Sequence, residues 1–147
     1  MKEQVISFDT AKLAKEKGFD EPCLDAYNLR GNLYSNGWCE YINDNDCELP
    51  FTSLALREKD VLAPTQSLLQ KWLREKHNIG LWISIGIMYP KLVFEAEISY
   101  IENGSGKFKE ITPKLPEYYD IDYSDTYSLS YEEALEIGLQ EALKLIK

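Results

Sequence analysis

The sequence has few of the side chains that most often carry enzyme chemistry or hold a metal. Its single histidine is His77, and its three cysteines, Cys23, Cys39 and Cys47, form no Cys-x-x-Cys pair. Zinc sites usually draw their ligands in closely spaced pairs, so this spacing disfavours zinc and indicates buried or idle thiols. An odd set of cysteines without a signal peptide predicts a cytoplasmic protein with reduced thiols. We expect no metal and no cofactor.

The motifs of the common cofactor-dependent enzymes are also missing. The chain has no glycine-rich phosphate loop, no paired catalytic carboxylates, no metal-ligand helix and no nucleophile elbow. Histidine ordinarily titrates near neutral pH, so His77 is the first candidate for acid–base catalysis. No serine or cysteine, however, lies in a sequence context that marks it as a nucleophile for His77 to activate. Its place at the end of a predicted helix favours a partly charged imidazole beside the helix dipole. A small enzyme with an unfamiliar site, pairing His77 with a carboxylate in a pocket, stays an alternative.

Positive charge and long apolar runs are scarce as well. The chain carries 25 acidic and 16 basic side chains, a net charge of −9. A surface of that sign repels phosphates, so we expect no direct nucleic-acid binding. The longest apolar-rich stretch, residues 79–88, is too short to span a bilayer, so we expect no membrane association. The oligomeric state is left open.

What the chain does have is the composition of one globular domain. It contains 147 residues, of which 44% are hydrophobic and 28% charged. At this length a folded chain hides roughly two-thirds of the surface that its unfolded form exposes, so it can build its own core. No internal repeat or linker divides the sequence. We therefore predict a single domain over residues 1–147.

Two helices in the first half of the chain are predicted from their end signals. The first runs from about Phe8 to Lys17, with Ser7 as its N-cap and Gly18 in the left-handed turn that ends it. The second is announced by Ala63-Pro64-Thr65, because proline suits the first helical turn. Asn78 can take the left-handed turn that ends this helix.

A third helix and a β-meander are predicted in the second half. The helix begins with the capping box Ser130-Tyr131-Glu132-Glu133 and runs to the C-terminus. Alternating apolar residues predict strands over 81–87 and 92–100, and a third strand is expected over 108–111. A tight turn at Tyr89-Pro90 would bring all the apolar positions of the first two strands onto one face. This register pairs Ile87 with Leu92, Ile85 with Phe94 and Ile83 with Ala96.

The fold predicted from these elements is α+β. Two further short strands are expected over 24–27 and 33–34, around a turn at Asn28-Leu29-Arg30-Gly31. The order is then roughly α-β-β-α-β-β-β-α. Three helices would pack mainly on one face of an antiparallel β-meander.

The face of the meander that points away from the helices is the first candidate interaction surface. Its apolar members would lie beside serine and glutamate side chains. If they are uncovered, they form a patch suited to a partner protein or to a second copy of the chain. The alternative is that residues 20–62 cover them. The apolar candidates are Trp82, Met88, Val93, Ile101 and Phe108.

A second candidate is the acidic and tyrosine-rich stretch over residues 117–127. Its aspartates lack the glycine and the distal glutamate of a calcium loop, so a cation site is disfavoured. Carboxylates spaced among tyrosines suit a basic partner, or an acidic mimic of nucleic acid that inhibits a DNA-processing enzyme. The alternative without a binding role is a surface loop whose tyrosines pack against the protein and whose aspartates are solvated. The candidate residues are Tyr118, Tyr119, Asp120, Asp122, Tyr123 and Asp125.

Three segments together resemble a known group of proteins. They are residues 7–19, residues 63–77 with the string APTQSLLQKWLRE, and the C-terminal segment that begins YEEAL and ends ALKLI. They resemble small uncharacterised proteins that are common in phages and prophages of Bacteroides-like gut bacteria. The resemblance implies a bacterial cytoplasm and a phage-derived gene, but no functional residues, because the group has no established activity. Our leading hypothesis is a non-enzymatic accessory protein that binds another protein.

Overall fold

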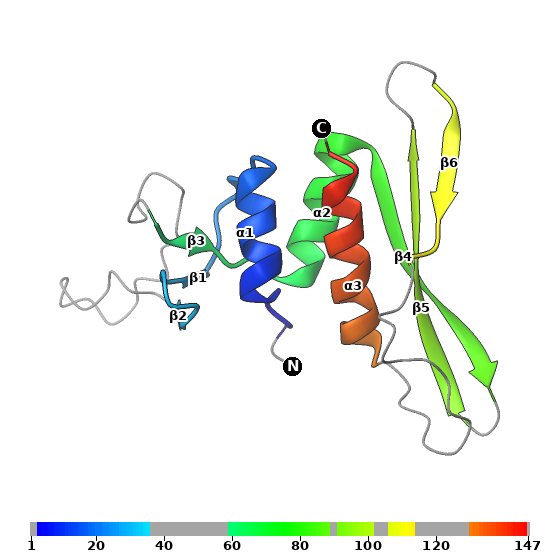
Figure 1. Ribbon diagram of the computed structural model, residues 1–147, viewed down its shortest axis with the longest axis horizontal. Helices are drawn as coiled ribbons and strands as arrows, with labels where there is room; N and C mark the ends of the chain where they lie inside the picture. The colour runs from blue at the N-terminus through cyan, green and yellow to red at the C-terminus, as the bar shows by residue number, and fades with distance from the viewer. Residues whose placement is uncertain (1–2, 36–58, 89–90, 102–105, 114–129, 147) are drawn as a thin grey trace. The chain divides into compact units, whose positions relative to one another are not determined.

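The computed structural model describes residues 3–35, 59–88, 91–101, 106–113 and 130–146. These residues form three helices and two three-stranded antiparallel sheets, in the order α-β-β-β-α-β-β-β-α (Figure 1). The predicted α+β class and the order of the elements are confirmed, with one short strand added. The chain divides into two compact units at the step from Trp72 to Leu73. Whether the two units fold as one cooperative domain stays a prediction.

The first unit contains a small sheet in the order β2-β1-β3. The predicted turn between β1 and β2 is confirmed: Asn28 Oδ1 accepts hydrogen bonds from the backbone N–H groups of Arg30 and Asn32, at 2.9 and 3.0 Å. Gly31 takes the left-handed conformation with φ 78°, which costs glycine little because it has no Cβ. The helices and strands of this unit are α1 (Phe8–Glu16), β1 (Asp25–Tyr27), β2 (Leu33–Ser35), β3 (Val61–Leu62) and the start of α2 (Gln66–His77).

The ends of α1 follow the predicted capping chemistry. Ser7 Oγ accepts from the backbone N–H of Thr10 at 3.3 Å, which satisfies one unpaired donor of the first turn. Gly18 has φ 86°, and the N–H of Phe19 donates to the carbonyl of Ala14 at 2.9 Å. This is the bond that closes a helix over a left-handed residue. Sequence-local signals therefore set both ends of α1.

Helix α2 begins two residues later than it would with Pro64 as its first residue. Thr65 Oγ1 accepts from the N–H of Leu68 at 3.3 Å, so Thr65 is the cap and Pro64 precedes it. The N–H of Gln66 donates to the carbonyl of Gln4 at 2.9 Å, so the N-terminal segment satisfies a second donor. At the other end Asn78 has φ 55°, which confirms the predicted left-handed turn.

The second unit contains a long hairpin and one covering helix, in the sheet order β4-β5-β6. The predicted register is confirmed, since Ile83 pairs with Ala96, Ile85 with Phe94 and Ile87 with Leu92. The turn at residues 89–90 lies outside the described residues. The elements of this unit after α2 are β4 (Ile79–Met88), β5 (Lys91–Ile101), β6 (Phe108–Ile111) and α3 (Tyr131–Lys144).

Helix α3 starts at the predicted capping box and packs closely on the hairpin. Ser130 Oγ accepts from the N–H of Glu133 at 3.2 Å, and Glu133 Oε2 accepts from the N–H of Ser130 at 2.8 Å. At Gly138 an added Cβ would lie 2.7 Å from Ala96 Cβ and 2.7 Å from Leu81 Cδ1. Glycine thus lets the helix approach the strands closely. The buried apolar side chains of this contact include Leu81, Ala96, Ile98, Leu139 and Leu143.

Candidate interaction surface

The hairpin of the second unit is longer than the helix that covers it. With 14 residues, α3 spans about 21 Å at 1.5 Å per residue. With 11 residues, β5 spans about 36 Å at 3.3 Å per residue. The helix therefore covers little more than half of the strand. Figure 1 shows the turn end of the hairpin extending past the first residues of α3.

The start of α3 marks where the covered part of the hairpin ends. Tyr131, the first helical residue, meets Phe94 with ring centroids 6.2 Å apart and planes at 83°. Beyond this contact Ile85, Ile87 and Leu92 are 63, 83 and 53% exposed. These three residues form the distal patch. They were predicted to share the core face of the meander: the register is right, but the cover of α3 stops short of them.

The opposite face of the same sheet carries the apolar residues predicted as an interaction surface. Register places Trp82 opposite Glu97, and Ile101 opposite Phe108, so their side chains share the face turned away from α3. Trp82, Ile101 and Phe108 are 39, 52 and 64% exposed, while Val93 is half-buried. We call this surface the far face. The register places Met88 on the far face as well, but the structure does not describe its side chain.

The indole of Trp82 lies along the far face. Its Nε1–H donates to Glu97 Oε2 at 3.0 Å, across the β4–β5 pair. On the other side, Trp82 Cζ3 is 3.8 Å from the position where a Cβ on Gly80 would stand. This is an ordinary van der Waals distance, so the edge of the ring lies against the backbone at Gly80. The hydrogen bond to Glu97 fixes the other edge, and part of the ring surface is in solvent.

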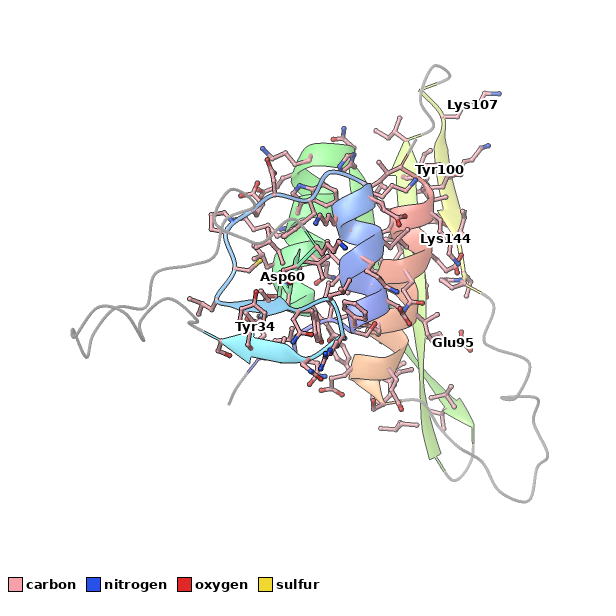
Figure 2. The ribbon with its side chains drawn as sticks, turned by 60° about the vertical axis from the view of Figure 1, so that its left-hand side comes forward. Tyr34, Asp60, Glu95, Tyr100, Lys107 and Lys144 are labelled. Carbon is pink, nitrogen blue, oxygen red and sulfur yellow. The ribbon has the colours of Figure 1, made fainter. Side chains whose placement is uncertain are left out.

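Three carboxylates share the far face with Trp82. Glu95 pairs opposite Ser84, Glu97 opposite Trp82, and Glu110 opposite Ser99. No ion pair holds these carboxylates within the part of the chain that the structure describes. Figure 2 shows Glu95 on the side of the sheet away from α3. The described far face therefore combines exposed apolar groups with unneutralised negative charge.

The acidic tyrosine stretch falls in a part of the chain that the structure does not describe. Residues 114–129 are outside the described ranges, and this covers every candidate predicted there. The hypotheses of a basic partner, a nucleic-acid mimic or a cation site on this stretch stay predictions. The candidates concerned are Tyr118, Tyr119, Asp120, Asp122, Tyr123 and Asp125.

His77 and Cys23 lie in surroundings that favour their neutral forms. His77 is the last residue of α2, and burial lowers the pKa of its imidazole from the ordinary 6.5. This desolvation opposes the charged form of the imidazole that the helix dipole would favour. Burial raises the pKa of the Cys23 thiol to about 12, with nearby Asp25 and then Glu21 adding to the shift. Cys23 Sγ donates to the Glu21 carbonyl at 3.3 Å, and a thiol held in this form is a poor nucleophile.

The buried carboxylates of the first unit are already engaged. Asp60 Oδ2 accepts from the Tyr34 hydroxyl at 2.9 Å (Figure 2), and Asp25 Oδ1 accepts from the Ser35 hydroxyl. Lys15 Nζ donates to the Asp60 carbonyl at 2.9 Å. Both aspartates are less than 10% exposed. Buried polar groups need such partners, so these bonds account for the two acids as parts of the fold.

A small pocket in the second unit does not supply the catalytic arrangement that the enzyme alternative requires. No histidine lines it, and the one acidic residue among its lining residues, Glu95, has its side chain on the far face. Its only other side-chain polar group is the Thr112 hydroxyl. The lining residues are Glu95, Ala96, Thr112, Pro113, Ala134 and Ile137.

The described residues show neither a cluster of metal ligands nor a membrane-spanning helix. Among the described residues, no three His, Cys, Asp or Glu side chains gather closely enough to hold a metal ion. Every helix in the described ranges is too short or too polar to cross a bilayer. No family model, curated protein or solved structure matches the chain.

Proposed function

We propose that this protein is a non-enzymatic binding protein that docks another protein on the far face of the β4-β5-β6 sheet. The observation that carries the proposal is the exposure of Trp82, Ile101 and Phe108 on one strand surface of a sheet whose other face packs on α3. The sequence resemblance adds the setting of an accessory protein of a phage or prophage.

The composition of the far face supports docking of a protein. Exposed apolar side chains that lie next to one another and are bordered by polar groups are typical of interaction sites. Aromatic residues are enriched at the centres of protein interfaces. On the far face, Ile101 and Phe108 stand directly opposite each other, and Trp82 lies on β4 opposite Glu97, four residues along β5 from Ile101. The glutamates Glu95 and Glu110 supply polar groups around them.

A site-specific photocrosslinker tests whether the far face is the docking surface. The photoreactive residue replaces Phe108 in the full chain, expressed in a related bacterium with and without phage infection. A matched variant carries it at Leu29, which is 62% exposed in a turn of the first unit. We expect a discrete crosslinked protein from position 108 that is missing from position 29.

The double variant Ile101→Ser, Phe108→Ser completes this test. Both positions are exposed, so the fold should persist, which circular dichroism and the thermal midpoint check. We expect the same partner to be lost from affinity capture by the double variant and kept by Leu29→Ser. A partner captured equally by both variants, or crosslinked equally from both positions, would contradict docking on the far face.

A further inference from the structure

The chemistry of the partner follows from the surroundings of Trp82, if the proposed docking on the far face holds. Trp82, Glu95 and Glu97 form what we call the cation pad. The indole lies along the sheet, with Nε1–H donating to Glu97 Oε2 at 3.0 Å and Cζ3 lying 3.8 Å from the position of a Cβ on Gly80. At 39% exposure, the ring keeps part of its surface available to a group that approaches from solvent.

Among the side chains that the structure describes on the far face, the charges nearest the indole in register are the carboxylates of Glu95 and Glu97. Glu95 and Glu97 are two residues apart on β5, so their Cβ atoms lie roughly 7 Å apart on one face. Glu97 uses Oε2 for the indole and keeps Oε1 for another donor. Lys109 pairs opposite Tyr100 and so belongs to the face on the α3 side. The basic residue that shares the far-face register is Lys91, at the turn end of the hairpin, four and six residues from the two glutamates.

We propose that the cation pad binds an arginine side chain of the partner, on a segment that also presents apolar residues. A guanidinium can stack on an indole face through a cation–π contact. Its edge carries N–H donors in a planar fork, which reach carboxylates beside the ring. Trp82 supplies the ring, Glu95 and Glu97 supply the acceptors, and Ile101 and Phe108 receive the apolar neighbours of the arginine. A lysine ammonium is a point charge and satisfies this combination less well.

Titration of the full-length ¹⁵N-labelled protein with synthetic peptides tests the cation pad. The probe is a capped peptide in which serines separate arginine from valine, so that an extended peptide presents both on one face. It is compared with peptides in which citrulline or lysine replaces every arginine. Citrulline keeps the shape and removes the charge. The signal is the Trp82 indole N–H resonance, assigned by its loss in Trp82→Phe. We expect the arginine peptide to shift this resonance and to bind roughly tenfold tighter than the citrulline peptide, with lysine between them.

Charge-removing variants locate the effect. Glu97→Gln and Glu95→Gln should each weaken the arginine peptide by roughly threefold or more and leave the citrulline peptide unchanged. The control is Glu16→Gln, which removes one exposed carboxylate from α1 in the first unit. The affinity of Glu16→Gln for the arginine peptide should equal that of the unaltered protein within experimental error. Thermal midpoints of the three variants check that each is folded.

The following outcomes would overturn the proposal that the cation pad binds arginine. Equal affinity for arginine and citrulline peptides, or an equal loss in Glu16→Gln and Glu97→Gln, would show that no local recognition of the cation occurs. A lysine peptide that binds as tightly as arginine would overturn the stacking geometry. No binding by any peptide would also overturn it. The crosslinks from position 108 do not depend on arginine, so the docking proposal is judged separately.

Discussion

The two units of this chain make their small sheets in different ways. In the first unit the strands have three, three and two residues, and buried Asp25 and Asp60 tie them together through side-chain hydrogen bonds. In the second unit β4 and β5 have 10 and 11 residues in unbroken register. The long hairpin is held by its backbone ladder and by α3, and its ends and outer face remain exposed.

This difference separates residues that the fold needs from residues that it does not. A two-residue strand cannot supply many ladder bonds, so the first unit depends on side chains placed far apart in the sequence, such as Tyr34 and Asp60. The hairpin is longer than its helix, and so it presents apolar side chains whose removal leaves the core intact. Side chains of this second kind are free to serve binding.

The largest effect is expected where α3 meets the hairpin. Leu139 is fully buried, so Leu139→Ala removes apolar contacts and leaves a cavity, and should lower the free energy of unfolding by about 2–5 kcal/mol. Urea denaturation followed by circular dichroism measures the change. Leu29→Ala, at a site 62% exposed, is the control and should change it by less than about 0.5 kcal/mol. Similar values for the two variants would show that α3 is not part of the core.

An intermediate effect is expected in the first unit. Tyr34→Phe removes the hydroxyl that donates to Asp60 Oδ2, and a buried acceptor without its donor should cost about 1–3 kcal/mol. The control Tyr131→Phe removes the hydroxyl of an exposed tyrosine and keeps the ring against Phe94. It should be nearly neutral in the same urea experiment. If both tyrosines behave alike, the first unit does not depend on its polar contacts as the comparison requires.

A smaller effect is expected from pH. Because burial lowers the pKa of His77 in the folded chain, the unfolded chain takes up a proton first as the pH falls through 6.5. Stability should therefore decline below pH 6.5 until the folded imidazole also titrates, and His77→Gln should lack this part of the decline. The chain has one histidine, so its ring proton signals can be followed by NMR in the folded and urea-unfolded states. A folded pKa above 6.5 would indicate that the helix dipole prevails.

The smallest effect is expected at the distal patch. Ile87→Thr keeps a β-branched side chain at a position that is 83% exposed, so the free energy of unfolding should change by less than about 0.5 kcal/mol. Leu81→Ala, on the same face of the same strand but buried, should lose about 2–5 kcal/mol. A large loss in Ile87→Thr would mean that the hairpin end is part of the core and would remove it from the exposed surface.

Local chemistry made most of the fold predictable from the sequence. Ser7, Asn78 and Ser130 mark helix ends with hydrogen bonds to neighbours three or four residues away or with a left-handed backbone. The register of β4 and β5 followed from alternation together with the predicted turn at Tyr89-Pro90, because a shift of one residue would put the alternating apolar positions of the two strands on opposite faces. Strand β3 was missed because two residues are too few to show a period.

The extent of the exposed surface was less predictable, for a geometric reason. Alternation tells which face of a strand a residue occupies, and it correctly placed Trp82, Ile101 and Phe108 together. It does not tell how far along the strand a helix reaches, so it does not predict that Ile85 and Ile87 lie beyond the cover of α3. The rise per residue of helix and strand held the missing signal, since 14 helical residues are shorter than 11 extended ones. The hydrogen bond that orients the Trp82 ring comes from a cross-strand glutamate, which no local pattern reports.

Strand β6 lies at one end of the sheet order, and this position carries a risk of aggregation. All four of its residues are exposed, including Phe108 and Ile111. An exposed apolar strand at the edge of a sheet is a template on which another chain can add strands and begin a fibre. Lys109 and Glu110 place one charge on each face between the two apolar residues. The same strand that offers an apolar surface for binding thus carries the charges that oppose uncontrolled growth of the sheet.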